Sequence, residues 1–198
     1  MSKKIISAII LILCVCFILS GCDNIGTFMG IEGDEIEYSI ENGEATVVKV
    51  PNKETITKVV IPDEYEGVPV TKIADFSVVN LEYVDAIHIG KNVKEIGDWA
   101  LENNQKVTKF TVDKENEYFC DVDGVLFTKD MKTLLFYPIA KDLQDELDDK
   151  GQVKKDDYGN NIKYSVYTIP DGVEVIHTKA FYKCYPLKTI AIPDSVKR

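Results

Sequence analysis

The amino-acid sequence predicts a solenoid of α/β type, mostly β, whose coils of about 23 residues stack on one another. Two observations lead to this fold class. One apolar spacing recurs in five short segments, and a second half-motif precedes three of them. With 45% hydrophobic residues, agreement of the five segments at every position has a chance probability of about 10⁻⁵. The segments are Ile56/Val59/Ile61, Val84/Ile87/Ile89, Val107/Phe110/Val112, Tyr164/Tyr167/Ile169 and Leu187/Ile190/Ile192.

Each of the five segments predicts a short strand with one side toward the core. The second and third apolar positions are two residues apart, so their side chains point to the same face of a strand. Three segments end in Ile-Pro-Asp, at Ile61-Pro62-Asp63, Ile169-Pro170-Asp171 and Ile192-Pro193-Asp194. Proline lacks the N–H that a strand ladder needs and Asp favours a turn, so we expect each strand to end there.

The half-motif predicts the other side of each coil. It reads Val-x-x-Ile at Val70, Val93 and Val173, and four and five residues after its Ile stand a small residue and a large apolar one, such as Ala100-Leu101. This pair suits a single tight turn of helix packed on the strand layer. Because Val70 and Val93 are 23 residues apart, we expect each coil to hold one strand and one short back helix or irregular back segment.

The stretch from Val173 to Pro193 resembles the BspA-type leucine-rich repeat, in the pattern V-x-x-I-x-x-x-A-F-x-x-C-x-x-L-x-x-I-x-I-P. The resemblance covers about residues 36–198 and implies a leucine-rich repeat domain over that range. It places Cys184 in the family's cysteine position. Asn104 stands where another coil would have that cysteine, which suggests a degenerate coil.

Two hairpins are expected beside the repeats. Asn42-Gly43 favours a type I′ turn between Ile36–Ile40 and Ala45–Val50, and this hairpin would cap the first coil. Residues 113–163 break the period and resemble, in part, the hairpin often inserted in such proteins, with its turn at residues 129–132.

The charged stretch and the C-terminus complete the expected organisation. Lys141 to Lys163 has few apolar residues, so we expect an exposed loop or a short helix. Val196 begins another coil whose next apolar position would be residue 199. We therefore expect the last coil to be truncated, in a shortened product or a fragment of a longer array.

The N-terminus predicts a bacterial lipoprotein. Lys3 and Lys4 precede an apolar run, Ile5 to Leu19, which is shorter than the roughly 20 residues of a membrane-spanning helix. Leu19-Ser20-Gly21-Cys22 resembles the lipobox, which implies cleavage after Gly21 and a lipid on Cys22. We expect a signal peptide over residues 1–21, a flexible tether over residues 22–35, and a lipid-anchored extracytoplasmic location on the cell membrane or cell surface. An uncleaved N-terminal helix is the alternative.

The composition restricts the possible partners. There are 33 Asp and Glu against 23 Lys and Arg, a net charge of -10, so nucleic-acid binding is disfavoured because phosphate neutralisation needs a basic surface. Cys14 and Cys16 leave with the signal peptide and Cys22 would carry lipid. Cys120 and Cys184 remain, and whether they form a disulfide is left open.

The sequence predicts no catalytic residue, cofactor or metal site. Asp121-Val122-Asp123-Gly124 comes nearest to a calcium loop, but Phe119 stands where its first ligand would be. The family resemblance implies that this segment is the entry turn of the inserted hairpin. Cys184, with apolar neighbours, is expected to be a packed core thiol rather than a nucleophile. His88 is expected to point outward from a strand and His177 to lie in a back turn.

The function expected from this reading is a non-catalytic binding or adhesion module for an extracellular protein or glycan partner. The resemblance implies adhesion, and a solenoid presents a long regular surface. The alternatives are a cell-envelope enzyme, either a hydrolase or a metal-dependent one, and a truncated remnant of a longer array. The residues proposed for a contact surface are His88, Lys109, Thr111, Tyr182 and Tyr185.

Overall fold

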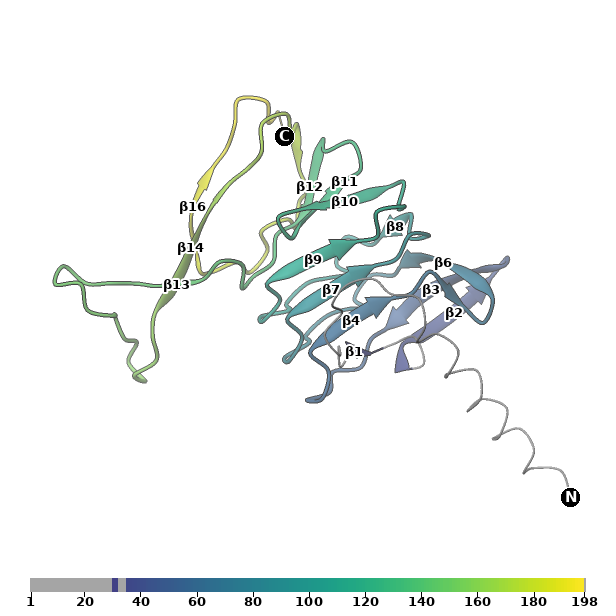
Figure 1. Ribbon diagram of the computed structural model, residues 1–198, viewed down its shortest axis with the longest axis horizontal. Helices are drawn as coiled ribbons and strands as arrows, with labels where there is room; N and C mark the ends of the chain where they lie inside the picture. Colours follow the sequence, from purple (N-terminus) through teal and green to yellow (C-terminus); the bar gives the residue numbers. More distant parts are fainter. Residues whose placement is uncertain (1–29, 32–34, 198) are drawn as a thin grey trace, which may run out of the picture.

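The computed structural model describes residues 30–31 and 35–197, and its regular secondary structure is almost entirely β. Short strands are stacked side by side in several sheets, and an extended arm projects from one end (Figure 1). The strands are β1 Gly30–Ile31, β2 Glu37–Glu41, β3 Glu44–Lys49, β4 Lys58–Ile61, β5 Glu64–Tyr65, β6 Val68–Ile73, β7 Ala86–Ile89, β8 Glu95–Ile96, β9 Lys109–Val112, β10 Phe119–Val122, β11 Val125–Thr128, β12 Thr133–Phe136, β13 Gln144–Asp145, β14 Lys163–Thr168, β15 Val175–Ile176 and β16 Leu187–Ala191.

The first sheet, β1-β4-β7-β9, is the layer that the repeated apolar spacing predicts. Its strands are parallel, and Val59, Ile87 and Phe110 lie side by side, one from each of β4, β7 and β9. All three side chains are buried. The same position in successive repeats therefore falls in one row, and each row packs into the core because its members share a face of the sheet.

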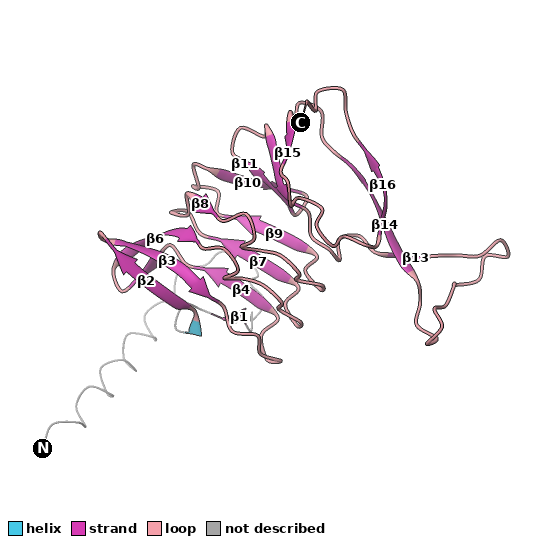
Figure 2. Ribbon diagram, turned by 180° about the vertical axis from the view of Figure 1, so that it is seen from behind, coloured by secondary structure: helices cyan, strands magenta, loops and turns pink. Residues whose placement is uncertain are grey.

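The Val-x-x-Ile half-motif contributes to a second strand in these coils, whereas a single strand per coil was expected. β3, β6 and β8 pair in parallel, with Ile73 of β6 opposite Ile96 of β8. Each coil of the first block thus contributes a strand to two sheets, as Figure 2 shows for β4 with β6 and β7 with β8. Both apolar sides of a coil are buried by neighbouring coils rather than by a helix.

The prediction of short back helices is wrong, since no α-helix occurs in residues 35–197. The segments after β6, β8 and β15 are turns, and they contain residues with positive φ, namely Phe76, Asn103 and Lys183. A right-handed helix cannot include that conformation, so the backbone reverses instead of continuing. Ala100 and Ala180 are still buried against the strands, as the spacing predicts.

Asn104 does not mark a degenerate coil. Its side chain is buried, and its Nδ2 donates to the carbonyl oxygens of Val78 and Leu101 at 2.8 and 3.0 Å. Its Oδ1 accepts from the backbone N–H of Leu81 at 3.0 Å. The asparagine therefore completes the hydrogen bonds of two successive turns, a role that a cysteine side chain performs only weakly.

Both expected hairpins are present. β2 and β3 are antiparallel around Asn42 and Gly43, whose φ angles of 52° and 77° are those of a type I′ turn. β3 then pairs with β6, so this hairpin belongs to the sheet that contains β6 and β8, which is the second sheet, and lies at its N-terminal end. The predicted inserted hairpin is β11 with β12, and its turn lies at residues 129–132 as predicted. β10 and β11 form a second hairpin, whose turn at Asp123 and Gly124 we call the hairpin turn.

The insertion, residues 113–163, lies between two hydrophobic cores. The larger core contains the first coils together with Phe110 and Phe136, and the smaller contains Phe127, Ile169 and Cys184. β12 pairs in parallel with β15, so the insertion ends by rejoining the stack of coils. Beyond it, β14 and β16 form a separate sheet with β13.

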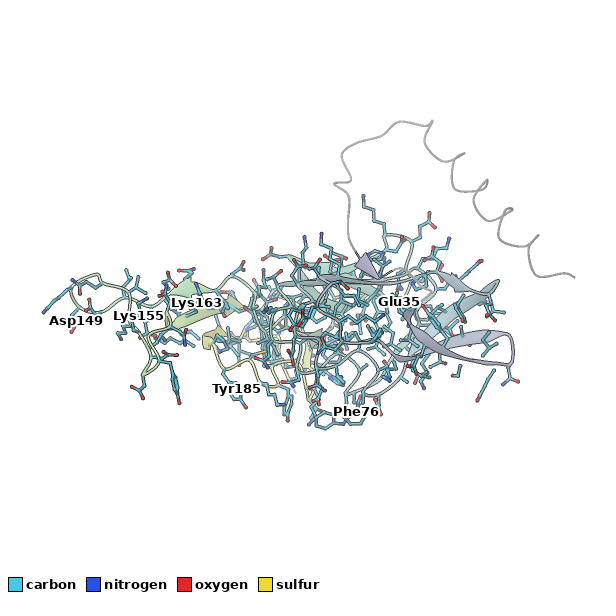
Figure 3. The ribbon with its side chains drawn as sticks, turned by 90° about the horizontal axis from the view of Figure 1, so that it is seen from below. Glu35, Phe76, Asp149, Lys155, Lys163 and Tyr185 are labelled. Carbon is cyan, nitrogen blue, oxygen red and sulfur yellow. The ribbon has the colours of Figure 1, made fainter. Side chains whose placement is uncertain are left out.

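From residue 146 to 162 the charged stretch is an exposed loop, one of the two forms expected for it, whereas Lys141 is buried and Gln144–Asp145 form β13. Residues 146–162 form an arm that extends away from the coils, with Asp149 and Lys155 far out along it (Figure 3).

The side chain of Ile192, which was expected to point inward, is 60% exposed. It follows β16, which is an edge strand of its sheet among the described residues, so nothing described covers its side chain.

Candidate binding surfaces

Three of the predicted contact residues lie together on the outer face of the first sheet. His88 of β7 is directly opposite Thr111 of β9, and its Nδ1 is 3.0 Å from the Thr111 Oγ1. Lys109, two residues before Thr111, is on the same face and exposed. This part of the predicted surface is therefore continuous, and its side chains are polar.

A cleft of about 310 Å³ opens where this face meets the hairpin turn between β10 and β11. Among the strands that the structure describes, β9 has no partner on this side. Instead, the Phe110 N–H donates to the Gly124 carbonyl at 2.8 Å and the Val112 N–H donates to the Asp121 carboxylate at 2.7 Å. The hairpin turn therefore closes the edge of the first sheet. The residues that line the cleft are Thr108, Lys109, Phe110, Thr111, Asp121, Asp123, Gly124, Lys141 and Asp142.

Lys141 is the most unusual residue of the cleft, because its side chain is only 5% exposed. Its Nζ is 2.8 Å from carboxylate oxygens of both Asp123 and Asp142. Burial lowers the pKa of the ammonium, but hydrogen bonds to the two carboxylates outweigh burial and raise its pKa above the usual value. Lys141 is thus a charged group that holds two carboxylates at the mouth of the cleft.

The other two predicted contact residues, Tyr182 and Tyr185, lie on the side of the back turns. Tyr182 is 41% and Tyr185 82% exposed, and Tyr185 protrudes on the same side of the molecule as Phe76 (Figure 3). The structure therefore does not join these tyrosines with His88, Lys109 and Thr111 in one surface. The five residues belong to two surfaces.

Tyr182 belongs to a row of stacked groups that sequence reasoning missed. Phe76 stacks on Trp99 with ring centroids 5.9 Å apart, and Trp99 meets the edge of Tyr182 at 5.6 Å. The Lys179 Nζ lies 3.5 Å from the centroid of Trp99 and 5.3 Å from that of Tyr182. We call Phe76, Trp99, Lys179 and Tyr182 the aromatic row.

A signal for the aromatic row was present in the repeat. Phe76, Trp99 and Lys179 each stand three residues after the Ile of a half-motif, at Ile73, Ile96 and Ile176. Equivalent positions in stacked coils lie above one another. The aromatic row joins coils that lie on either side of the insertion, residues 113–163. His177 also makes a contact between these coils, because its Nε2 is 3.2 Å from the Asp98 carboxylate.

Cys120 and Cys184 are free thiols in the structure, which answers the question that the sequence left open. Cys184 is buried in the smaller core, and burial raises its pKa to about 12. Its position is that of a packed core thiol, as predicted. The raised pKa keeps the sulfur protonated at neutral pH, and a nucleophile needs the thiolate form. Burial also raises the pKa of Cys120, whose Sγ lies 3.4 Å from the Sδ of Met131.

The segment Asp121-Val122-Asp123-Gly124 is a hairpin turn between β10 and β11, as expected. Asp123 and Gly124 have φ angles of 50° and 77°. In residues 30–31 and 35–197 no group of three or more His, Cys, Asp and Glu is arranged to hold a metal ion.

The repeats match a family model described as the BspA type leucine-rich repeat region, in six copies over residues 51–122 and 152–198. The chain belongs to this family. Members of the BspA type are typically cell-surface proteins and typically non-enzymatic. No match is found among curated proteins.

The fold is similar to that of several solved bacterial leucine-rich repeat proteins. A leucine-rich repeat protein from Eubacterium ventriosum is 21% identical with a TM-score of 0.48, and the match covers 72% of this chain and 43% of that one. A leucine-rich cell surface protein from Faecalibacterium prausnitzii is 21% identical with a TM-score of 0.44, over 86% and 44%. The leucine-rich repeat protein of T. pallidum is 15% identical with a TM-score of 0.48, over 85% and 73%. The chain thus spans less than half the length of the first two.

The predicted lipid site, Cys22, lies outside the described residues, as do the signal peptide and most of the tether. Among the residues that the structure describes, no helix has the length and apolar character needed to cross a membrane.

Proposed function

We propose that this BspA-type protein is a lipid-anchored, extracytoplasmic binding module without catalytic activity, and that it holds a protein partner through the aromatic row and Tyr185. The observation that supports this function is the exposure of large aromatic side chains on one side of the molecule: Phe76 is 58% and Tyr185 82% exposed. Aromatic residues are enriched where proteins bind each other, because each buries a large area and loses little side-chain entropy.

The geometry of the row favours a preorganised contact. Trp99 is held between Phe76 and Lys179, so its position does not depend on the partner. Lys183 adds a second ammonium, 5.4 Å from the Tyr182 ring. Carboxylates lie beside these ammonium groups, since the backbone N–H of Trp99 donates to the Asp75 carboxylate at 3.4 Å and the Asp98 carboxylate is next to His177. This side therefore carries both charges, which favours a partner whose contact surface is apolar with a polar rim.

The binding test compares wild type with the triple variant Phe76→Ala/Tyr182→Ala/Tyr185→Ala. Surface plasmon resonance over immobilised extracellular-matrix proteins, and adhesion to whole bacterial cells, measure the interaction. We expect the triple variant to bind at least tenfold more weakly, because hot-spot aromatics each contribute on the order of 1–2 kcal/mol. Tyr158→Ala is the matched control, since Tyr158 is an almost fully exposed tyrosine on the arm. Equal binding by the triple variant and wild type would argue against the aromatic row as the contact.

The location is tested separately through Cys22. The expressed full-length chain and its Cys22→Ala variant are compared by intact mass and by detergent-phase partition in a lipoprotein-competent host. We expect wild type alone to lose residues 1–21, gain the mass of a diacylglycerol and enter the detergent phase, because two long acyl chains suffice for stable anchoring. An unmodified wild-type chain in the aqueous phase would contradict the anchor.

A further inference from the structure

The cleft beside β9 has a lining in which opposite charges are paired. The Lys141 ammonium lies between the carboxylates of Asp123 and Asp142, at 2.8 Å from each. Asp121 accepts from the backbone N–H of Val112. Because an ammonium already sits between the two carboxylates, the lining disfavours a second cation there. The nearby carboxylates likewise disfavour a strongly anionic ligand.

The same lining disfavours an apolar ligand. Phe110 is its one large apolar residue, and that side chain is buried in the core. Thr108 and Thr111 add hydroxyl groups instead, and the Lys109 side chain is exposed beside them. An apolar ligand would therefore bury little hydrocarbon area, and area burial is the main source of affinity for such ligands.

Two features make the cleft a built site rather than a chance hollow. Lysine is rarely buried, and burying Lys141 is costly unless its charge is paired. Gly124 also lets the hairpin turn approach β9 closely, since a Cβ at that position would be 2.7 Å from the Cβ of Lys109. The ion pairs and the glycine together hold Asp123 and Asp142 in place at the mouth. Their side chains are nevertheless 80% and 64% exposed, and so accessible to a ligand.

We propose that this cleft binds the terminal sugar of an uncharged glycan. A sugar hydroxyl both donates and accepts hydrogen bonds, so it can donate to the exposed carboxylates and accept from the Lys109 ammonium. A volume of about 310 Å³ is at the lower end of small-molecule sites, which span roughly 300–1,000 Å³. It suits one or two sugar rings. Because the cleft is open and polar, binding is weak, in the millimolar range, and gains strength only when several copies of the protein bind one surface.

The test uses the full chain in a zwitterionic detergent, with the methyl glycosides of glucose, galactose, mannose and N-acetylglucosamine as probes. Saturation-transfer NMR titrations give the Kd for each. Asp123→Asn removes one carboxylate and retains a residue that tolerates positive φ, and Lys109→Gln removes the exposed ammonium. Asp149→Asn and Lys150→Gln remove the same charges from the arm and serve as controls. We expect at least one probe to bind, with a Kd raised tenfold or more by each cleft variant and unchanged by each control.

Three results would overturn the proposal. Either no neutral probe binds, or both cleft variants bind as wild type does, or a charged sugar titrated in the same way, glucuronate or glucosamine, binds more tightly than the neutral probes. If Asp123→Asn unfolds, as judged by its thermal transition, Lys109→Gln decides the question, because Lys109 is an exposed residue. The cleft shares no residue with the aromatic row. Glycoside binding that survives the triple aromatic variant would thus support this site whatever becomes of the proposed protein partner.

Discussion

Buried asparagines order the turns of the coils at the scale of single residues. Asn104 satisfies three backbone groups of two turns. Asn116 also satisfies buried backbone groups, since its Nδ2 donates to the carbonyl oxygens of Gly90 and Val93, both at 2.9 Å. Buried backbone groups need partners, and these two side chains supply them where the strands end.

Replacing Asn104 by Ala should lower the free energy of unfolding by about 3 kcal/mol, because three buried backbone groups lose their partner. Urea unfolding followed by circular dichroism measures the change. Gln105→Ala is the control: it removes an exposed amide one residue away, and we expect it to change stability by less than about 0.5 kcal/mol. Similar effects of the two substitutions would show that the Asn104 hydrogen bonds are not what orders the turns.

Cys184 should make the protein less stable at alkaline pH. Its pKa is raised to about 12 by burial, whereas an unfolded thiol titrates near 8.5. Between these values the folded state holds a proton that the unfolded state has lost. The stability that this thiol contributes is therefore complete below about pH 8.5 and decreases as the pH rises toward 12.

The measurement is the urea midpoint of wild type and Cys184→Ala from pH 8 to 11. We expect the wild-type midpoint to fall more steeply with pH. Burial also raises the pKa of Tyr167, which adds an alkaline loss of the same sign above about pH 10. That tyrosine is present in both proteins, so the difference between the two slopes reports on Cys184. Parallel slopes would mean that the thiol is solvated.

At the scale of elements, the hairpin turn between β10 and β11 ends the first sheet because it fits closely against β9. Gly43 and Gly124 both have a φ of 77°, so alanine is strained at either position. They differ in their surroundings. A Cβ at Gly43 would have no atom within 4 Å, whereas one at Gly124 would be 2.7 Å from the Cβ of Lys109.

The pair Gly124→Ala and Gly43→Ala therefore separates steric contact from backbone strain. We expect Gly43→Ala to lower the free energy of unfolding by about 1 kcal/mol, and Gly124→Ala to lower it by roughly 2 kcal/mol more, since β9 and the turn must move apart. Thermal unfolding of both variants measures the difference. Equal losses would show that the hairpin turn can withdraw from β9 without cost.

At the scale of the whole molecule, the two cores are unequal. The first coils share the larger core, while β14 and β16 pack on the smaller one and form a sheet that β9 does not join. The stability of a solenoid is approximately a sum over its coils and the contacts between neighbours. Apolar side chains at this end are less well covered, since Val166 of β14 is 53% exposed and Ile192 after β16 is 60% exposed, which implies that this end opens more readily.

Hydrogen exchange should show this inequality directly. We expect the backbone amides of β4 and β7 to be protected at least tenfold more than those of β14 and β16 at neutral pH, measured by mass spectrometry of peptic peptides. The arm, residues 146–162, serves as an internal reference for rapid exchange. Uniform protection across all four strands would indicate that the insertion couples the two cores into one cooperative unit.

Local spacing was sufficient for most of the fold. The apolar positions of β4, β7 and β9, the Asn42-Gly43 turn and the inserted hairpin follow from side-chain alternation and turn chemistry, which act over a few residues. The repeat also determined family membership and the packed position of Cys184. The expected back helices did not form, because a small residue followed by a large apolar one suits a turn as well as a helix. The positive φ of Phe76, Asn103 and Lys183 reverses the backbone there.

The two candidate surfaces were decided by tertiary structure. His177 and Asp98 are 79 residues apart, and Trp99 meets Lys179 and Tyr182 only because the insertion leaves the coils on either side of it in contact. In the same way, Lys141 appears in the sequence as the first residue of a charged loop. Its burial between two carboxylates depends on where the hairpin turn comes to lie against β9. Repeat spacing acts within a coil and between neighbouring coils, whereas these contacts depend on the path of the inserted chain, which no repeat specifies.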